Sequence, residues 1–331
     1  MSFAHMPRLD RRQVLATGAS LVAASAIPGG AFAQTYPARQ LKFIVPYPAG
    51  GTTDILPRIM QDWLSKRWGQ AIVVENKPGA AGNIGVEAAY NAEPDGYTIL
   101  VCAPSPFTVN QSLYPKLNFV PSEFVPVSII ATIPTALIVS PRMPANTIAE
   151  FIAYAKANPA KLTASTQGIG TTSHLTSEWF QMLTGTQFVS VPYRGSAPAL
   201  TDMMGGSVDL MFDNLGTSLQ LVKSGQLKMI ALATEKRMDS LPGVPTIAET
   251  LPEFVSATWV GVFLPPKTPQ ATADKLNADF NEGLKDPEIA RRFIENGCDP
   301  LGTTPQAAAA FIRSEADRWS TVIKAANIKL Q

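Results

Sequence analysis

The chain has 331 residues, of which 46% are hydrophobic and only 16% are charged, and its net charge is +1. This length is sufficient for two domains that each bury a core. The absence of a basic block argues against nucleic acid as a partner, and the 28 prolines are too many for a bundle of long helices.

The N-terminus has the pattern of an export signal. Arg11 and Arg12 precede a short apolar stretch, residues 14–27, which is followed by the small residues Ala31-Phe32-Ala33. The paired arginines resemble a twin-arginine signal, and the apolar stretch is too short to span a membrane. We therefore expect residues 1–33 to be a signal peptide cleaved after about Ala33, and the protein to be periplasmic without direct insertion into the membrane.

The two cysteines, Cys102 and Cys298, leave two states open. Export places them in an oxidising compartment, which favours a disulfide. Sequence alone does not show whether their Cα atoms come close enough for one. The alternative is a pair of buried thiols that pack as small apolar side chains.

Apolar strands alternate with amphipathic helices along the rest of the chain. The expected strands are residues 41–45, 71–75, 97–102, 162–166, 188–192, 208–212, 227–234 and 256–264. The expected helices are residues 55–68, 83–92, 147–158, 175–183, a segment ending at 204, 269–284, 287–296 and 305–326. Such alternation indicates mostly parallel sheets with right-handed crossovers.

We predict an α/β fold with two lobes, each a mostly parallel sheet flanked by helices. Lobe 1 comprises residues 34–134 and 257–331, and lobe 2 comprises residues 135–256. A proline-punctuated region, residues 119–144, contains two short apolar runs, and we expect the chain to cross between the lobes near residues 134–139 and again near residues 256–262. The C-terminal helices are too short for a third domain, so we expect them to pack back on the first lobe.

The first strand is joined to the first helix by Tyr47-Pro48-Ala49-Gly50-Gly51-Thr52-Thr53-Asp54. Adjacent glycines permit a close approach of the backbone, and Thr52 or Thr53 can cap the helix. The N–H groups of a first helical turn have no partner within the helix, and they lie at the positive end of its dipole. The loop is therefore a candidate seat for a small anion. Tyr47 offers it an apolar wall and a hydroxyl group.

A second candidate seat has the same design. Gly168-Ile169-Gly170-Thr171-Thr172-Ser173-His174 follows a strand and opens a helix, and its hydroxyl side chains supply caps and donors. The loop nearly matches a dinucleotide fingerprint, but the third glycine and the acidic residue at the end of the next strand are missing. We therefore expect no nucleotide and no other cofactor.

Four motifs occur in one order along the mature chain: residues 47–54, Asn76-Lys77-Pro78-Gly79-Ala80-Ala81-Gly82, Pro192-Tyr193-Arg194-Gly195 and Gly302-Thr303-Thr304-Pro305. With the export signal, this set strongly resembles the substrate-binding proteins of tripartite tricarboxylate transporters, the Bug or TctC family. The resemblance implies a monomer with a periplasmic-binding-protein (Venus-flytrap) fold. Such a receptor closes around a small carboxylate and delivers it to the membrane permease subunits of the transporter.

In that family the ligand carboxylates are held largely by backbone amides of two loops, one in each lobe. These loops correspond to the two anion seats above, and the resemblance adds Ser105 and the Tyr193 region as further walls. No catalytic or metal-binding residue is expected. The predicted ligand-binding residues are Tyr47, Pro48, Ala49, Gly50, Gly51, Thr52, Asp54, Ser105, Gly168, Gly170, Thr171, Thr172, Ser173, His174, Tyr193 and Asp213.

Some of these residues also have a structural interpretation. We interpret Asp54 as a first-turn carboxylate that faces its own backbone amides, and recognition of a ligand ammonium group is the alternative. Asp213 ends a strand, where it either caps a helix or binds ligand through water. Arg194 is set aside, although guanidinium pairs well with carboxylates. His174 is the only histidine after residue 33, and with two distant cysteines it cannot form an ordinary zinc site.

Two other functions remain open. A sensor subunit that reports its ligand to a membrane kinase would have the same binding site. A periplasmic serine hydrolase is disfavoured, because the chain has no G-x-S-x-G or H-E-x-x-H motif and His174 is its only available base. The ligand itself also remains open among dicarboxylates, aromatic acids and amino acids, because backbone amides recognise a carboxylate and not the skeleton behind it.

Overall fold

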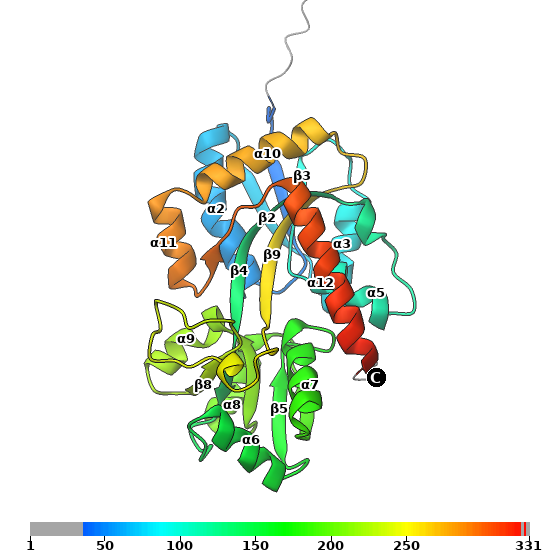
Figure 1. Cartoon of the computed structure of the whole chain (residues 1–331). Helices are drawn as coiled ribbons and strands as arrows, with labels where there is room; N and C mark the ends of the chain where they lie inside the picture. The colour runs from blue at the N-terminus through cyan, green and yellow to red at the C-terminus, as the bar shows by residue number, and fades with distance from the viewer. Residues whose placement is uncertain (1–35, 326–327, 329–331) are drawn as a thin grey trace, which may run out of the picture. The chain divides into compact units, whose positions relative to one another are not determined.

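A computed structural model describes residues 36–325 and 328 of the chain. The predicted signal peptide lies outside the described residues. The chain divides into two compact units, residues 1–38 and 39–331, and every helix and strand described belongs to the second. Within this unit, strands and helices alternate as expected, and the α/β fold class is confirmed (Figure 1).

One group of strands, called sheet A, has β1 (Leu41–Val45) next to β2 (Ile72–Asn76) and β3 (Thr98–Cys102), and both neighbours run parallel to β1. The sheet continues in antiparallel direction through β9 (Ala257–Leu264) and the first part of β4 (Val125–Val139). A short strand, β10 (Asp299–Pro300), also pairs with β4. The helices around it are α2 (Thr52–Trp68), α3 (Asn83–Tyr90), α10 (Gln270–Gly283), α11 (Pro287–Glu295) and α12 (Pro305–Ala325).

The second group, called sheet B, contains the end of β4 together with β7 (Leu210–Asn214), β5 (Leu162–Thr166) and β6 (Phe188–Pro192). β5 runs parallel to β6 and β7, whereas β7 and β8 (Lys228–Leu232) pair antiparallel with β4. Its helices are α6 (Ile148–Ala157), α7 (Thr172–Thr184), α8 (Ser196–Gly205) and α9 (Leu215–Lys223).

The two sheets share strand β4, which is a single strand of 15 residues. Its residues up to Pro134 pair with β9, and its residues from Thr135 onward pair with β7 and β8. The sequence suggested two separate runs, because proline interrupts a strand. The structure accommodates Pro126 beside a register shift, where a bulge removes the need for regular pairing. One continuous strand therefore connects the two halves.

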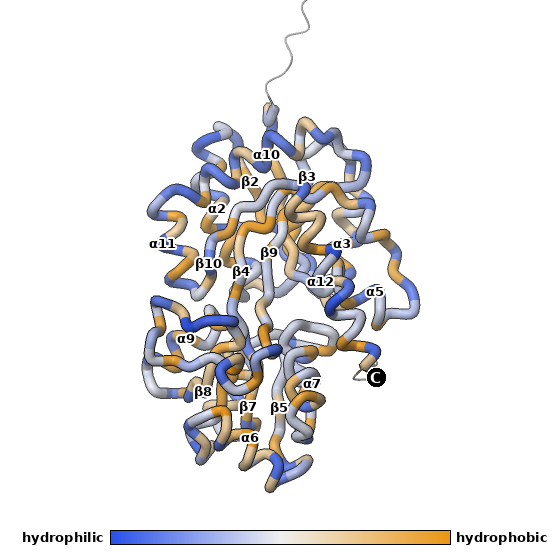
Figure 2. The backbone as a smooth tube through the Cα atoms, in the orientation of Figure 1, coloured by the Kyte–Doolittle hydropathy of each residue, from blue (hydrophilic) through white to orange (hydrophobic). Residues whose placement is uncertain are grey.

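Each sheet has its own hydrophobic core. Figure 2 shows apolar residues along β4 and β7, and mixed polar and apolar residues along the surrounding helices. Buried aromatic rings dominate both cores, with Trp259 and Phe263 of β9 at sheet A, and Phe151 of α6, Phe180 of α7 and Phe212 of β7 at sheet B. Each such ring contributes roughly 1.5–3 kcal/mol through burial. Each sheet therefore has a group of buried apolar side chains packed against it.

The C-terminal helix α12 packs on both halves and not on the first alone. Trp319 of α12 meets Trp179 of α7 edge to face, with ring centroids 6.3 Å apart. Arg318 Nη1 donates to the carbonyl oxygen of Val255 at 2.8 Å. The expectation that the helix packs back on the first lobe therefore accounts for only part of its contacts.

Several short elements left no periodic pattern in the sequence, because one turn is too short to show one. They are α4 (Ser105–Thr108), α5 (Asn110–Leu113), η2 (Ala80–Gly82), η3 (Pro121–Glu123) and η4 (Ile247–Glu249).

Of the two states left open for Cys102 and Cys298, the structure shows two buried free thiols. In the part of the chain that the structure describes, no helix is both long and apolar enough to cross a membrane.

Candidate binding site

The first loop leads from β1 into α2, and its geometry is set by two glycines. Gly50 has φ +86°, a left-handed conformation that favours glycine. Gly51 is the N-cap residue of α2, with extended backbone at φ −81° and ψ 163°, and no side chain caps the helix. The expectation that Thr52 or Thr53 caps α2 is therefore wrong. Both threonines already lie inside the first helical turn, where they cannot take the N-cap position.

Asp54 is held entirely by groups of the protein itself. Its carboxylate accepts the Gly50 N–H at 2.9 Å, the Asn76 amide at 2.8 Å and the Arg58 guanidinium at 2.9–3.0 Å. Burial raises the pKa of Asp54, but the hydrogen bonds from Arg58, Gly50 and Asn76 outweigh it and lower the pKa. The carboxylate thus fixes the loop onto the first turn of α2.

The start of α2 retains donors with no protein partner. Among the described residues, nothing accepts a hydrogen bond from the backbone N–H groups of Gly51, Thr52 or Thr53. These amides lie at the positive end of a 17-residue helix. They can hold the oxygen atoms of an anion.

The second loop leads from β5 into α7 and uses most of its polar groups internally. Thr171 caps α7, because its Oγ1 accepts the His174 N–H at 3.4 Å and donates to the Gly168 carbonyl at 2.7 Å. The Gly168 N–H donates to Thr166 Oγ1, and the Gly170 N–H donates to His174 Nδ1, each at 3.3 Å. The two glycine amides are therefore occupied within the loop.

His174 holds this loop as a neutral imidazole. Burial lowers its pKa, and its Nδ1 must be unprotonated to accept the Gly170 N–H. Its Nε2 lies 3.8 Å from Glu178 Oε1, a carboxyl whose pKa is raised by burial. The geometry supports a role in shaping the loop.

The start of α7 also retains unpaired donors. Within residues 36–325, the N–H groups of Thr172 and Ser173 donate to no protein acceptor. The Ser173 hydroxyl is buried and has no hydrogen-bond partner there, and Ser173 is only 2% exposed. The Thr172 hydroxyl reaches Thr258 Oγ1 of β9 at 3.5 Å.

Asp213 joins the ends of three strands of sheet B. It is fully buried and accepts hydrogen bonds from Gln167 at 2.9 Å, Ser196 at 2.7 Å and Thr217 at 2.5 Å. Burial raises its pKa, and these hydrogen bonds oppose the rise. Because Gln167, Ser196 and Thr217 follow β5, β6 and β7, this carboxyl fixes the edge of the sheet from which the second loop extends.

Each of the two loops lies close to an element of the other half. At the first contact, a Cβ placed on Gly216 at the start of α9 would lie 3.5 Å from Thr52 Oγ1 of α2. At the second, a Cβ placed on Gly170 would lie 3.2 Å from Leu113 Cδ1 and 3.7 Å from Asn110 Oδ1 of α5. The start of α2 thus lies beside sheet B, and the second loop lies beside the sheet A half.

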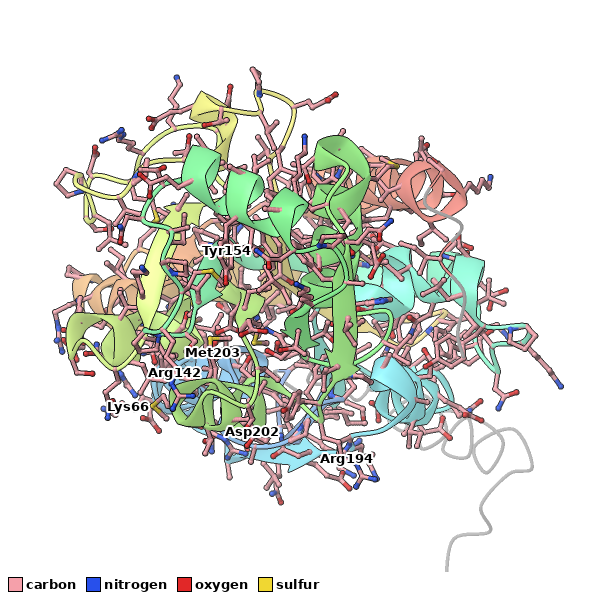
Figure 3. All side chains as sticks on the ribbon, turned by 90° about the horizontal axis from the view of Figure 1, so that it is seen from below. Lys66, Arg142, Tyr154, Arg194, Asp202 and Met203 are labelled. Atoms are coloured by element: carbon pink, nitrogen blue, oxygen red, sulfur yellow. The ribbon has the colours of Figure 1, made fainter. Side chains whose placement is uncertain are left out.

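Other predicted site residues direct their polar atoms elsewhere. The Tyr47 hydroxyl lies 3.9 Å from Cys102 Sγ at the sheet A core, and burial raises its pKa. The Tyr193 hydroxyl donates to Asp202 at 2.6 Å, and burial together with that carboxylate raises its pKa to about 12. Arg194 is exposed at the outer surface, as Figure 3 shows.

The remaining predicted residues divide by exposure. Ser105, at the start of α4, is 4% exposed, whereas Pro48 and Ala49 are exposed.

Sequence reasoning missed Asn110 and Gly216. Asn110 is fully buried, donates to Asn83 Oδ1 and the Ala81 carbonyl, and leaves its own Oδ1 without a partner among the described residues. It lies on a one-turn helix that gives no sequence signal. Gly216 follows a strand and opens a helix, so the rule that identified the two loops could have found it.

Residues 56–328 match the model of the tripartite tricarboxylate transporter family receptor, TctC. The chain belongs to this family. The resemblance inferred from the four ordered motifs is therefore confirmed. TctC proteins are periplasmic solute receptors, so the chain is a binding protein and not an enzyme.

Curated relatives and solved structures of the TctC type cover nearly the whole chain. BugT of Bordetella pertussis is 34% identical over 98% of this chain and 100% of its own length. An R. palustris protein solved with adipate has 35% identity and a TM-score of 0.86, covering 89% of this chain and 100% of its own. MatC from Rhodopseudomonas palustris with bound malate has 29% identity and a TM-score of 0.81, covering 87% and 100%.

Proposed function

We propose that the protein binds a small carboxylate between the first turns of α2 and α7. The observation that carries the proposal is the set of unpaired donors there: the N–H groups of residues 51–53, those of Thr172 and Ser173, and the buried Ser173 hydroxyl. Neither loop contains a lysine or an arginine, and the nearby Arg58 is bound to Asp54. An anion there is held by neutral donors and helix dipoles.

The bound forms of two relatives support the ligand class. The R. palustris structure holds adipate and the MatC structure holds malate, and both ligands are dicarboxylates. Two helix N-termini with unpaired donors suit an acid with one or two carboxylate groups. The receptor would take such an acid in the periplasm and deliver it to the permease subunits of a tripartite tricarboxylate transporter.

The proposal includes closure of two lobes around the ligand. The lobes are residues 34–134 with 257–331, and residues 135–256. In support, β4 changes its strand partners between Pro134 and Thr135, and the chain returns to sheet A directly before β9. A receptor crossed by two such segments can open and close as a hinge. The proposal also takes the receptor to be a monomer released by cleavage after about Ala33.

Proline at the first position of each helix tests the site directly. Thr52→Pro and Thr172→Pro each remove one unpaired N–H, and proline is tolerated at this position of a helix. The preceding residues, Gly51 and Thr171, already have the extended conformation that proline requires of its neighbour. A hydrogen bond to a charged group contributes about 1.5–3 kcal/mol, so each variant should weaken binding roughly 10- to 150-fold.

The measurement is calorimetric titration with adipate, malate and other small acids, after a thermal-shift screen has identified a ligand. Gln270→Pro is the matched control, because it places proline at the first position of α10 on an exposed residue distant in sequence from both loops. It should bind as the wild type does. Unchanged affinity in both threonine variants would show that these helix N-termini do not hold the ligand.

A further inference from the structure

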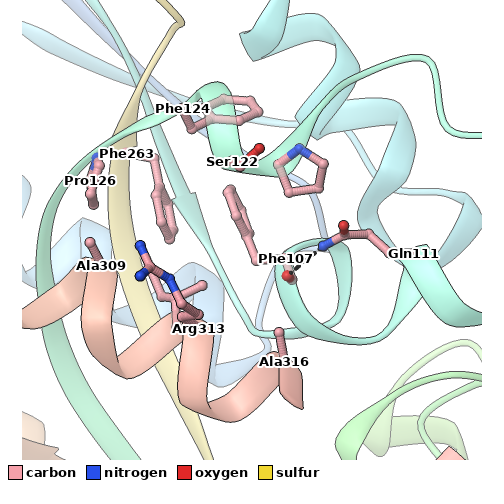
Figure 4. Close-up of a pocket in the computed structure, with 11 residues that line it drawn as sticks. Phe107, Gln111, Ser122, Phe124, Pro126, Phe263, Ala309, Arg313 and Ala316 are labelled. Atoms are coloured by element: carbon pink, nitrogen blue, oxygen red, sulfur yellow. Dashed lines mark hydrogen bonds between the residues drawn. The ribbon is translucent and has the colours of Figure 1, made fainter. Parts of the chain in front are cut away.

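A groove separate from the two loops lies beside the C-terminal helix, between α12, α4 and η3 (Figure 4). Its volume is about 230 Å³. The phenylalanine rings of Phe107, Phe124 and Phe263 line it from the sheet A side, and Figure 4 shows Arg313 and Gln111 flanking the rings. None of its lining residues belongs to residues 46–54 or 167–174.

The aromatic side of the groove is rigid. Phe107 and Phe263 stack with ring centroids 4.0 Å apart and an interplanar angle of 10°, and Phe124 meets Phe107 edge to face at 5.3 Å. All three rings are at most 5% exposed, so they are fixed by the core behind them. A surface that is already ordered loses little conformational entropy when a ligand binds.

Four residues of α12 line the groove, and two of them, Ala309 and Ala316, are short, whereas Ile312 and Arg313 are long. Ala309, Arg313 and Ala316 are spaced four and three residues apart, so they share one face of the helix. The two alanines leave space that a larger apolar side chain would fill. A cavity of about 150 Å³ lined by apolar side chains can hold benzene. The present volume is sufficient for one aromatic ring with a short polar arm.

The charge of the residues that line the groove determines which polar group the ligand should carry. Arg313 is the one charged residue that lines the groove, and it is exposed. Within the described part of the chain, no hydrogen bond or ion pair is found for the Arg313 guanidinium. A guanidinium group pairs with a carboxylate through two parallel hydrogen bonds. The complementary ligand is therefore an aromatic ring that carries a carboxylate.

We propose that this groove is a second binding site, for a monocyclic aromatic carboxylate such as phenylacetate. The ring occupies the groove between α12 residues such as Ile312 and Ala316 and the small exposed part of the phenylalanine rings, and the carboxylate pairs with Arg313. The site does not depend on the proposed carboxylate site between α2 and α7. It would give the receptor a means to recognise aromatic acids at a surface that includes its C-terminal helix.

The experiment is ligand-observed NMR titration of the full chain with phenylacetate. Ala316→Trp fills the groove and should abolish the signal, and Arg313→Gln should weaken binding about three- to fivefold, as loss of an exposed ion pair predicts. Ala310→Trp is the matched control, because Ala310 is exposed on the same helix and does not line the groove. It should bind as the wild type does.

All titrations are repeated in the Thr172→Pro background, in which binding of phenylacetate between α2 and α7 should be roughly 10- to 150-fold weaker. If Ala316→Trp does not fold, Ala309→Trp is the alternative variant that fills the groove. The proposal is overturned if phenylacetate does not bind, or if the groove-filling variants bind it as the wild type does. Equal binding of benzyl alcohol and phenylacetate would overturn the role of Arg313.

Discussion

At the scale of single residues, Asp54 is the side chain that shapes the first loop. Its carboxylate accepts hydrogen bonds from a backbone amide, a neutral side chain and a guanidinium at once, and Asp54 is 3% exposed. The same carboxylate engages the Arg58 guanidinium in an ion pair, whereas the amides of residues 51–53 have no partner among the described residues. An anion bound there therefore meets main-chain donors and not a fixed cation.

Asp54→Asn should destabilise the protein by about 1.5–3 kcal/mol, because the amide places N–H groups opposite existing donors. The pKa of Asp54 is lower in the folded state than the value of about 3.9 in an unfolded chain. Its stabilisation is thus fully present above that value and is lost as the pH falls through the folded pKa. The measurement is urea unfolding of both proteins from pH 7 down to pH 3, where the difference should shrink.

Asp62→Asn is the control for this prediction. Asp62 lies on the same helix, and its side chain is 68% exposed and 3.8 Å from Arg292. An exposed pair of this kind contributes little, so the variant should be within about 0.5 kcal/mol of the wild type. A pH-independent effect of Asp54→Asn would contradict the assignment of the shifted pKa to this carboxylate.

The role of a residue could be predicted from the sequence where that role depends on near neighbours in the chain. Thr171 is the cap of α7, and Asp54 faces a backbone amide, because both interactions join residues three or four apart. The sequence did not predict that the Tyr193 hydroxyl donates to Asp202, or that the Tyr47 hydroxyl lies beside Cys102. These orientations depend on packing against residues up to 55 positions away.

At the scale of elements, the start of α9 touches the end of α11 through backbone alone. A Cβ on Gly216 would overlap the carbonyl oxygen of Asn296, and a Cβ on Gly297 would lie 2.7 Å from Gly216 Cα. The negative end of one helix dipole thus faces the positive end of another. Glycine at position 216 allows the two halves to come this close.

Gly216→Ala should lower the unfolding free energy by about 1–3 kcal/mol, since the added methyl group forces two backbones apart. This is the reverse of the usual gain of roughly 0.5–1 kcal/mol for such a change inside a helix. If the halves close on the ligand as proposed, its affinity should fall as well. Thermal unfolding with and without ligand measures both effects.

Gly205→Ala is the matched control, because nothing lies within 4 Å of a Cβ at that position near the end of α8. It should leave stability and affinity unchanged or slightly improved. A Gly216→Ala protein as stable as the wild type would mean that α9 and α11 are not in contact in solution.

Most helices and strands could be predicted because each carries its own periodic pattern. β6 has the predicted bounds, residues 188–192, and α6 starts directly after the expected Thr147, whose side chain caps it. β4 was not predicted as one strand, since a register shift beside Pro126 and the change of partners after Pro134 are tertiary features. The one-turn helix α5, which carries Asn110, has no pattern of its own.

At the scale of the whole molecule, α12 is a third connection between the two halves. Its start packs against sheet A elements, and Trp319, Val322 and Ile323 pack with Leu175 of α7. The ordered motifs of the sequence indicated the family, because its architecture is shared along the whole chain. They did not indicate that the last helix reaches the second half.

Trp319→Ala should cost about 3–5 kcal/mol, the usual effect of removing a buried indole, since Trp319 is 1% exposed. Hydrogen exchange should show the larger loss of protection in α7 and the end of α12, with β1 and β3 little changed. Asp317→Ala, at an exposed position of the same helix, is the control and should be near neutral. Loss of protection spread evenly over both sheets would contradict this connection.

The edge-to-face pair of Trp179 and Trp319 also has a practical consequence. The other three tryptophans, Trp63, Trp68 and Trp259, belong to α2 and β9 on the sheet A side. If the halves close on the ligand as proposed, the surroundings of this indole pair should change while the remaining three tryptophans keep theirs. The intrinsic tryptophan fluorescence of the protein would then report that movement without an added dye. A library of acids could be screened with this signal on unlabelled protein.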